Sequence, residues 1–143
     1  MNMNGLHYTL AGEQRKQMAQ HNDVGKWGER YALDMLDREG YILVETDWRP
    51  PRSHRDLDII AYTPDRRMIV FIEVKTRSRK QAVLPEDAVD RKKILNLRMI
   101  ANQYIKMYNI TEEVRFDIIS IIGEENNVES YEHIVDAFNP NLL

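Results

Sequence analysis

The chain has no cysteine, and none of its apolar runs is longer than the five residues 68–72. Without cysteine there is no disulfide framework, thiol nucleophile, thiolate zinc site or iron–sulfur cluster. Five apolar residues fall far short of the roughly 18 that a membrane-spanning helix requires. The first residues also lack the basic and apolar regions of a secretory signal, so we predict a cytoplasmic protein without a membrane segment.

Repeats and low-complexity tracts are absent too, and the length of 143 residues suits one domain. Residues 1–20 are polar and follow no clear period, which predicts a flexible N-terminal arm. We therefore expect a single domain over residues 21–143.

The hydrophobic pattern predicts two helices and five strands. The first helix runs from a cap at Asn22 or Asp23 to Gly40, which is suited to end it, and a second helix covers residues 86–107. Strands are expected at 41–48, 56–62, 67–76 and 114–122, with an edge strand within 128–138. This α-β-β-β-α-β-β order predicts an α/β fold with a mixed central sheet flanked by helices.

Two of these strands carry acidic residues that are costly to bury. Alternation in the strand at 56–62 places Asp56, Asp58 and Ile60 on one face and Leu57, Ile59 and Ala61 on the other. In the next strand Glu73 and Lys75 share a face, and hairpin pairing would bring Asp58 beside Glu73. Two convergent carboxylates suit a hard cation such as Mg²⁺, with Lys75 able to assist chemistry at a phosphate. The alternative is an ordinary charged face of an exposed hairpin.

A third acid lies in the first helix. Gly25, Gly28, Glu29 and Ala32 fall on one helical face, and the small residues would let the helix lie close to the sheet with Glu29 directed at the site. Alternatively, Glu29 is a surface acid favoured by the start of the helix.

The net charge of −3 argues, on average, against a nucleic-acid-binding protein. However, residues 1–108 hold 19 Lys/Arg against 15 Asp/Glu, whereas residues 109–143 hold one against eight. Basic side chains cluster around the candidate acids, and we predict that they bind nucleic-acid phosphates: Arg49, Arg52, Arg55, Arg77, Arg79, Lys80 and Lys93. The alternative is a set of solvated basic loops.

These segments together resemble the YraN family of bacterial proteins. The resemblance rests on Gly-Lys-Trp-Gly-Glu-Arg-Tyr-Ala at 25–32, Asp-Leu-Asp-Ile-Ile-Ala at 56–61 and Phe-Ile-Glu-Val-Lys-Thr-Arg at 71–77, and continues through Lys93, Leu97, Ala101, Tyr104 and 115–117. It covers roughly residues 22–122. The family in turn resembles the PD-(D/E)XK nuclease superfamily, including archaeal Holliday-junction resolvases. The chain departs from the family at Arg55 and Asp56, where Gly-Glu is usual.

The resemblance implies a restriction-endonuclease-like three-layer sandwich. It implies that Asp58, Glu73 and the carbonyl of Val74 are ligands of Mg²⁺ or Mn²⁺, that Lys75 is the catalytic lysine and that Glu29 is an accessory acid. The expected function is a metal-dependent endonuclease that hydrolyses DNA phosphodiester bonds, with branched or structured DNA as a candidate substrate. A homodimer would suit the cutting of two strands, although no residue indicates one.

Two other functions remain open. In the first, the nuclease fold is retained as a nucleic-acid-binding module with weak or no catalysis. In the second, the acidic C-terminal segment docks on a basic partner. For the remaining polar residues we favour structural roles: Arg115 and Asp117 pairing on one strand face, and His54 solvated in its loop.

Overall fold

The computed structural model describes residues 26–82 and 91–138. The predicted arm at 1–20, the capping residues Asn22 and Asp23, and residues 86–90 of the predicted second helix lie outside the described residues. The elements are α2 (Trp27–Arg38), β1 (Ile42–Trp48), β2 (Leu57–Tyr62), β3 (Met68–Arg77), α3 (Arg79–Ala82), α4 (Arg91–Met107), β4 (Glu113–Glu124) and β5 (Asn127–Ile134). No described helix has the length and apolarity needed to cross a membrane.

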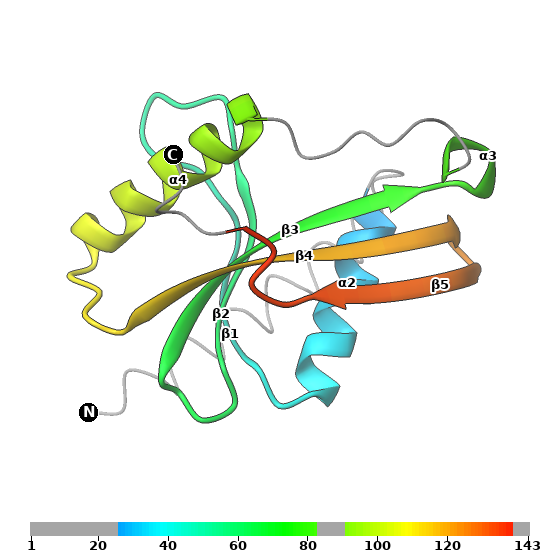
Figure 1. Ribbon diagram of the computed structural model, residues 1–143, viewed down its shortest axis with the longest axis horizontal. Helices are drawn as coiled ribbons and strands as arrows, with labels where there is room; N and C mark the ends of the chain where they lie inside the picture. The colour runs from blue at the N-terminus through cyan, green and yellow to red at the C-terminus, as the bar shows by residue number, and fades with distance from the viewer. Residues whose placement is uncertain (1–25, 83–90, 139–143) are drawn as a thin grey trace.

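The five strands form one mixed sheet in the order β1-β2-β3-β4-β5. The β3–β4 pair is parallel and the other three pairs are antiparallel. Parallel pairing requires a crossover, and α4 lies in the connection between β3 and β4. Figure 1 shows β3, β4 and β5 running side by side across the molecule. The predicted α/β class, the mixed sheet and the element order are confirmed.

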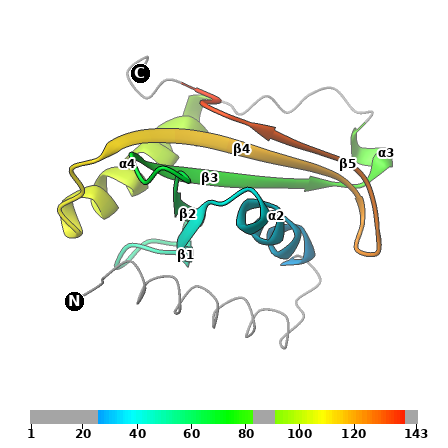
Figure 2. The ribbon, with the colours of Figure 1, turned by 90° about the horizontal axis from the view of Figure 1, so that it is seen from below.

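Each face of the sheet packs against one long helix, which gives three layers (Figures 1 and 2). Leu33 and Leu36 of α2 are fully buried against the face that includes Ile59 and Ile72. On the other face, Leu97, Ala101 and Tyr104 of α4 recur at helical spacing and pack around Phe71 and Phe116. Apolar residues alternate between the two cores along β3, as expected of a central strand covered on both faces.

Helix α2 ends where the sequence predicts and lies very close to β3. Gly40 follows the helix with φ +88°, a left-handed conformation that glycine adopts without strain. Near the other end of the helix, a Cβ added to Gly28 would overlap the hydroxyl of Thr76 in β3. The absence of a side chain at Gly28 therefore sets the distance between α2 and the sheet, and thereby the position of the neighbouring Glu29.

Candidate functional site

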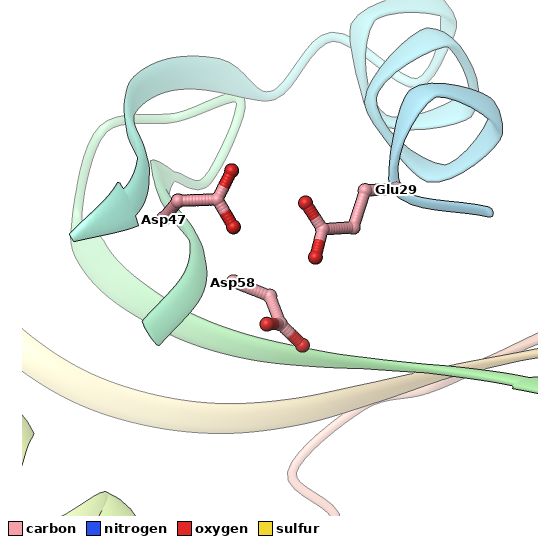
Figure 3. Close-up of side chains that lie close together, drawn as sticks. All are labelled: Glu29, Asp47 and Asp58. Atoms are coloured by element: carbon pink, nitrogen blue, oxygen red, sulfur yellow. The ribbon is translucent and has the colours of Figure 1, made fainter. Parts of the chain in front are cut away.

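Three carboxylates from different elements converge between α2 and the β1–β2 pair. Glu29 comes from α2, Asp47 from β1 and Asp58 from β2, and one oxygen atom of each lies within 4.8 Å of the others. Figure 3 shows the three side chains directed toward a common space. All three are partly buried. We refer to Glu29, Asp47 and Asp58 as the acidic triad.

An irregularity in the β1–β2 pair directs two of these side chains to the same place. Asp47 has φ +49°, a left-handed conformation that costs energy for a residue other than glycine, although Asp tolerates it better than most. Asp47 and Asp58 fall opposite each other, between the register pairs Thr46↔Ile59 and Trp48↔Leu57. The left-handed residue turns the backbone at this point, so that both aspartates lie beside Glu29.

The expected alternation of β2 is wrong at this same point. The alternation predicts that Leu57 shares a face with Ile59 and Ala61, but Leu57 packs into the core on the α4 side, whereas the other two pack on the α2 side. The reason is that β2 leaves regular pairing here: its ladder with β3 ends at Ile59↔Ile72, one step before Asp58. Asp58 Oδ2 instead accepts a hydrogen bond from the backbone N–H of Val74, at 2.8 Å.

Burial and mutual repulsion make it unfavourable for the triad to be fully ionised. Burial, followed by the charges of Asp58 and Asp47, raises the pKa of Glu29 to about 8. Burial also raises the pKa of Asp58 to about 6, with the charge of Glu73 adding to the effect and the Val74 hydrogen bond opposing it. A cation between these groups would stabilise their charged forms.

A lysine at the start of α2 supplies part of that positive charge. Lys26 Nζ lies 3.0 Å from Asp47 Oδ1 and 3.5 Å from Glu29 Oε1. Burial lowers the pKa of Lys26, but the hydrogen bond to Asp47 and the charges of the two acids outweigh it and leave the pKa raised. Lys26 thus acts as an internal counter-ion of the triad.

Glu73 lies beside the triad but is not part of it. Its Oε1 is 2.6 Å from Lys93 Nζ of α4, so it faces the opposite helix from Glu29. Its charge nevertheless reaches Asp58. Within residues 26–82 and 91–138, Glu73 Oε2 and Glu29 Oε2 are both buried without a hydrogen-bond partner. An unpaired buried carboxylate oxygen is costly, which makes both atoms candidate ligand positions.

The remaining motif residues surround this point. Val74 lies against Asp58 through its N–H, while its carbonyl as a ligand stays a prediction. Lys75 is partly buried two residues after Glu73 in β3. The role predicted for Lys75 also remains a prediction.

The predicted phosphate-binding residues differ in how far their charges are already compensated. Arg49 Nε lies 2.6 Å from Asp56 Oδ1, and Arg79 Nη1 lies 3.7 Å from Glu129 Oε1. Lys93 pairs with Glu73, as described above. Of the other four, Arg52, Arg55 and Lys80 are exposed and Arg77 is partly buried. At least three of the seven cations are thus ion-paired within the protein, which reduces the positive field that the sequence alone suggests.

A second polar cluster, away from the triad, is structural. Asp117 is buried and accepts two hydrogen bonds from Arg115, at 2.9 and 2.7 Å, and one from the backbone of Asp136. His133 Nε2 lies 2.7 Å from the same carboxylate, so the cluster fastens the edge strand β5 to β4. The predicted Arg115–Asp117 pairing is confirmed. His54 is exposed in its loop, as expected.

Sequence reasoning missed Asp47. The residue lies in a correctly predicted strand, but nothing in the pattern of that strand marks a left-handed residue. The available signal was its position next to Trp48 and the Arg-Pro-Pro segment, where the strand had to end. Only the pairing register shows that this end lies opposite Asp58.

Comparisons with known proteins give a consistent match. The model of the family described as "Uncharacterised protein family UPF0102" matches residues 28–121. A UPF0102 protein of Bacteroides fragilis is 44% identical over 126 residues, 88% of this chain and 100% of the relative. A UPF0102 protein of Bacteroides thetaiotaomicron is 42% identical over the same shares, and one of Flavobacterium psychrophilum is 38% identical over 85% of this chain and 98% of its own length.

Proposed function

The chain belongs to the uncharacterised protein family UPF0102, which is the YraN family that its motifs resemble, and we propose that it is a divalent-metal-dependent endonuclease acting on DNA. The reaction would be hydrolysis of a phosphodiester bond, and branched or otherwise structured DNA is the substrate class to test first. The convergence of Glu29, Asp47 and Asp58 within 4.8 Å, beside the Glu73-Val74-Lys75 segment, carries this proposal.

The donor set fits a hard divalent cation. Every candidate ligand is an oxygen, as Mg²⁺ and Mn²⁺ prefer, and at least two carboxylate oxygens are buried without partners among the described residues. Asp47 and Asp58 extend from the sheet toward the space between the three carboxylates, and Glu29 extends toward it from α2 (Figure 3). A bound Mg²⁺ or Mn²⁺ would polarise a phosphate oxygen and lower the pKa of a water molecule.

The protein's own residues supply the rest of the proposed site. Asp58 is held by the Val74 N–H and so presents its carboxylate in a fixed orientation. Lys75 would neutralise charge that develops on the phosphate. Glu73 would join the ligands by exchanging the ammonium of Lys93 for the cation. Of the basic residues, Arg52, Arg55 and Lys80 are the exposed side chains most available to DNA phosphates.

Metal binding is the first test, because it does not depend on finding the substrate. Calorimetry with Mn²⁺ should give saturable binding to the wild-type protein. Asp58→Asn and Asp47→Asn keep side-chain shape but remove charge, and each should weaken binding at least tenfold, in line with the loss of ~1.5–3 kcal/mol that a charged contact typically contributes. Glu132→Gln, which alters an exposed acid of β5, is the matched control and should bind like wild type.

Cleavage is the second test. The wild-type protein with Mg²⁺ or Mn²⁺ should cut at least one of a set of linear, nicked, flapped, single-stranded and four-way-junction DNAs. Asp58→Ala, Glu73→Ala and Lys75→Ala should each abolish cutting, while Glu132→Gln should not. DNA binding that survives Asp58→Ala without any cleavage would instead identify a binding module. Absence of both metal binding and cleavage would refute the proposal.

A further inference from the structure

A pocket of about 250 Å³ opens between β3 and α4, on the face of the sheet away from α2. Its walls come from the β1–β2 loop, from β3 and from α4. The residues that matter here are Arg55, Glu73, Lys93, Asn96, Leu97 and Ile100. None of them except Glu73 belongs to the proposed chemical step.

The charges around the pocket favour an anion. Two acids line it, Asp56 and Glu73, but each is already ion-paired at 2.6 Å, with Arg49 and Lys93 respectively. Arg55 adds an exposed positive charge to the lining. The charged side chains of the lining balance, and the surplus of about one positive charge comes from Arg49, which neutralises Asp56 from outside the lining and leaves Arg55 uncompensated by the lining acids. One such charge suits a single phosphate group.

The rest of the lining does not suit inorganic phosphate alone. Leu97 and Ile100 provide an apolar wall. Asn96 contributes an amide whose Nδ2 is buried and makes no hydrogen bond within the described residues. A polar group left in this way is better satisfied by a ligand that brings an acceptor. The pocket is smaller than the roughly 300–1,000 Å³ of sites for drug-sized ligands, so it has room for one small unit.

We propose that this pocket binds one nucleotide of a nucleic-acid strand, with its phosphate at Arg55 and its sugar and base against Leu97, Ile100 and Asn96. The phosphate of a nucleotide matches the basic part of the lining, the apolar faces of its rings match Leu97 and Ile100, and the polar edge of its base matches Asn96. Binding of this kind holds a nucleotide by charge and by contact with its base.

The position of Glu73 connects this pocket to the triad. Glu73 forms part of the pocket wall, and the next residue, Val74, donates its N–H to Asp58. A nucleotide in the pocket would lie on the α4 side of β3 while the triad includes Glu29 from the α2 side, so the pocket would hold a part of the substrate near the triad rather than the scissile bond itself. In this sense the inference rests on the proposed function and assigns a subsite for the substrate.

The test uses the full chain, labelled with ¹⁵N and with ¹³C at methyl groups, in the presence of EDTA so that no divalent metal takes part. Deoxyadenosine 5′-monophosphate, deoxyadenosine and inorganic phosphate are titrated separately and followed by NMR. We expect the nucleotide to shift the side-chain amide signals of Asn96 and the methyl signals of Leu97 and Ile100 in a saturable way. Phosphate and deoxyadenosine should each bind at least tenfold more weakly.

Variants test which residues hold the nucleotide. Arg55→Gln and Asn96→Ala should each weaken nucleotide binding by about threefold to tenfold, as expected for one partly exposed polar contact. Arg55 is exposed, so its substitution leaves the core intact. Arg67→Gln removes an exposed arginine at the β2–β3 turn, outside the pocket, and should have no effect.

Equal affinities for nucleotide and inorganic phosphate would overturn the proposal in favour of a simple anion site. Shifts confined to residues outside the pocket, or binding unchanged by both Arg55→Gln and Asn96→Ala, would also overturn it. The Mn²⁺ titration of the triad is a separate measurement. Nucleotide binding without metal binding or cleavage would refute the proposed nuclease and leave the nucleotide pocket supported. Metal binding and cleavage without nucleotide binding would refute the pocket and leave the nuclease supported.

Discussion

Replacing Gly28 with alanine tests the contact that places Glu29 in the triad. In an ordinary helix this substitution stabilises, because alanine is favoured over glycine by about 1 kcal/mol. Here the new Cβ would overlap the Thr76 hydroxyl and stand 3.0 Å from both Cβ and Cγ2 of the same threonine. Rotation of Thr76 about its Cα–Cβ bond can move the hydroxyl but leaves the Thr76 Cβ 3.0 Å from the new Cβ, so full relief requires α2 to move away from β3.

The expected magnitude follows from these two opposing effects. Overpacking of this kind costs typically ~1–3 kcal/mol, and the crowding by three atoms places Gly28→Ala near the upper end. Subtracting a helix-propensity gain of about 1 kcal/mol leaves a net destabilisation of about 2 kcal/mol. For a domain of this size that corresponds to a fall in Tm of roughly 6–10 °C.

The assay is urea unfolding of wild type, Gly28→Ala, Thr76→Ala and the double variant. Because the two side chains compete for one space, the double variant should be at least about 1 kcal/mol more stable than the sum of the single changes predicts. Mn²⁺ affinity should fall in Gly28→Ala, since Glu29 moves with the helix, and recover in part in the double variant. A Gly28→Ala protein as stable as wild type would refute the close approach of α2 to β3.

Two pH-dependent predictions concern the two polar clusters. The folded-state pKa of Glu29 is raised from 4.5 to about 8, so the folded protein loses stability as pH rises through that window and the buried carboxyl is forced to ionise. In EDTA, Glu29→Gln should therefore be more stable than wild type at pH ~8.5 but not near pH ~4.5, as measured by urea unfolding. A pH-independent difference between the two proteins would contradict this cause. Burial lowers the pKa of His133, but its hydrogen bond to Asp117 outweighs this and raises the pKa above 6.5; the stabilisation is therefore complete below that value and lost as pH rises through the raised pKa. The deficit of His133→Gln should accordingly be larger near pH ~5.5 than near pH ~9 in thermal unfolding, and an equal deficit at both would show that packing alone is involved.

The secondary structure follows from local pattern to a large extent. Val70 and Ile72 face one core and Ile69 and Phe71 the other, so β3 is apolar on both faces, and a run of this kind predicts a central strand from its residues alone. Gly40 marks the end of α2 for a local reason as well, since its φ of +88° is a property of the turn itself. The helix face formed by small residues is also predictable for α2, because Gly28 and Ala32 recur at helical spacing.

The candidate site is predictable from the sequence only in part. Asp58 and Glu73 stand out because charged residues in apolar strands are costly, and the register does bring the two strands together at Ile59↔Ile72. Asp47 does not stand out, and the sequence predicts Lys93 only as a phosphate-binding residue, although it pairs with Glu73 at 2.6 Å. In both cases the two partners lie on different helices or strands, so the spacing of residues along one element cannot predict that they meet.

By itself, the sequence determined the two long helices, the five strands, most of their apolar faces and which strands carry the acids, because these depend on side-chain spacing along one element. Only the tertiary structure decided which acids meet. The left-handed Asp47 and the end of the β2–β3 ladder before Asp58 turn two carboxylates toward Glu29, while Glu73 faces Lys93. Which carboxylates meet depends on where the paired strands separate and how closely α2 packs on the sheet. Both are set by contacts between residues distant in the chain, which local spacing does not encode.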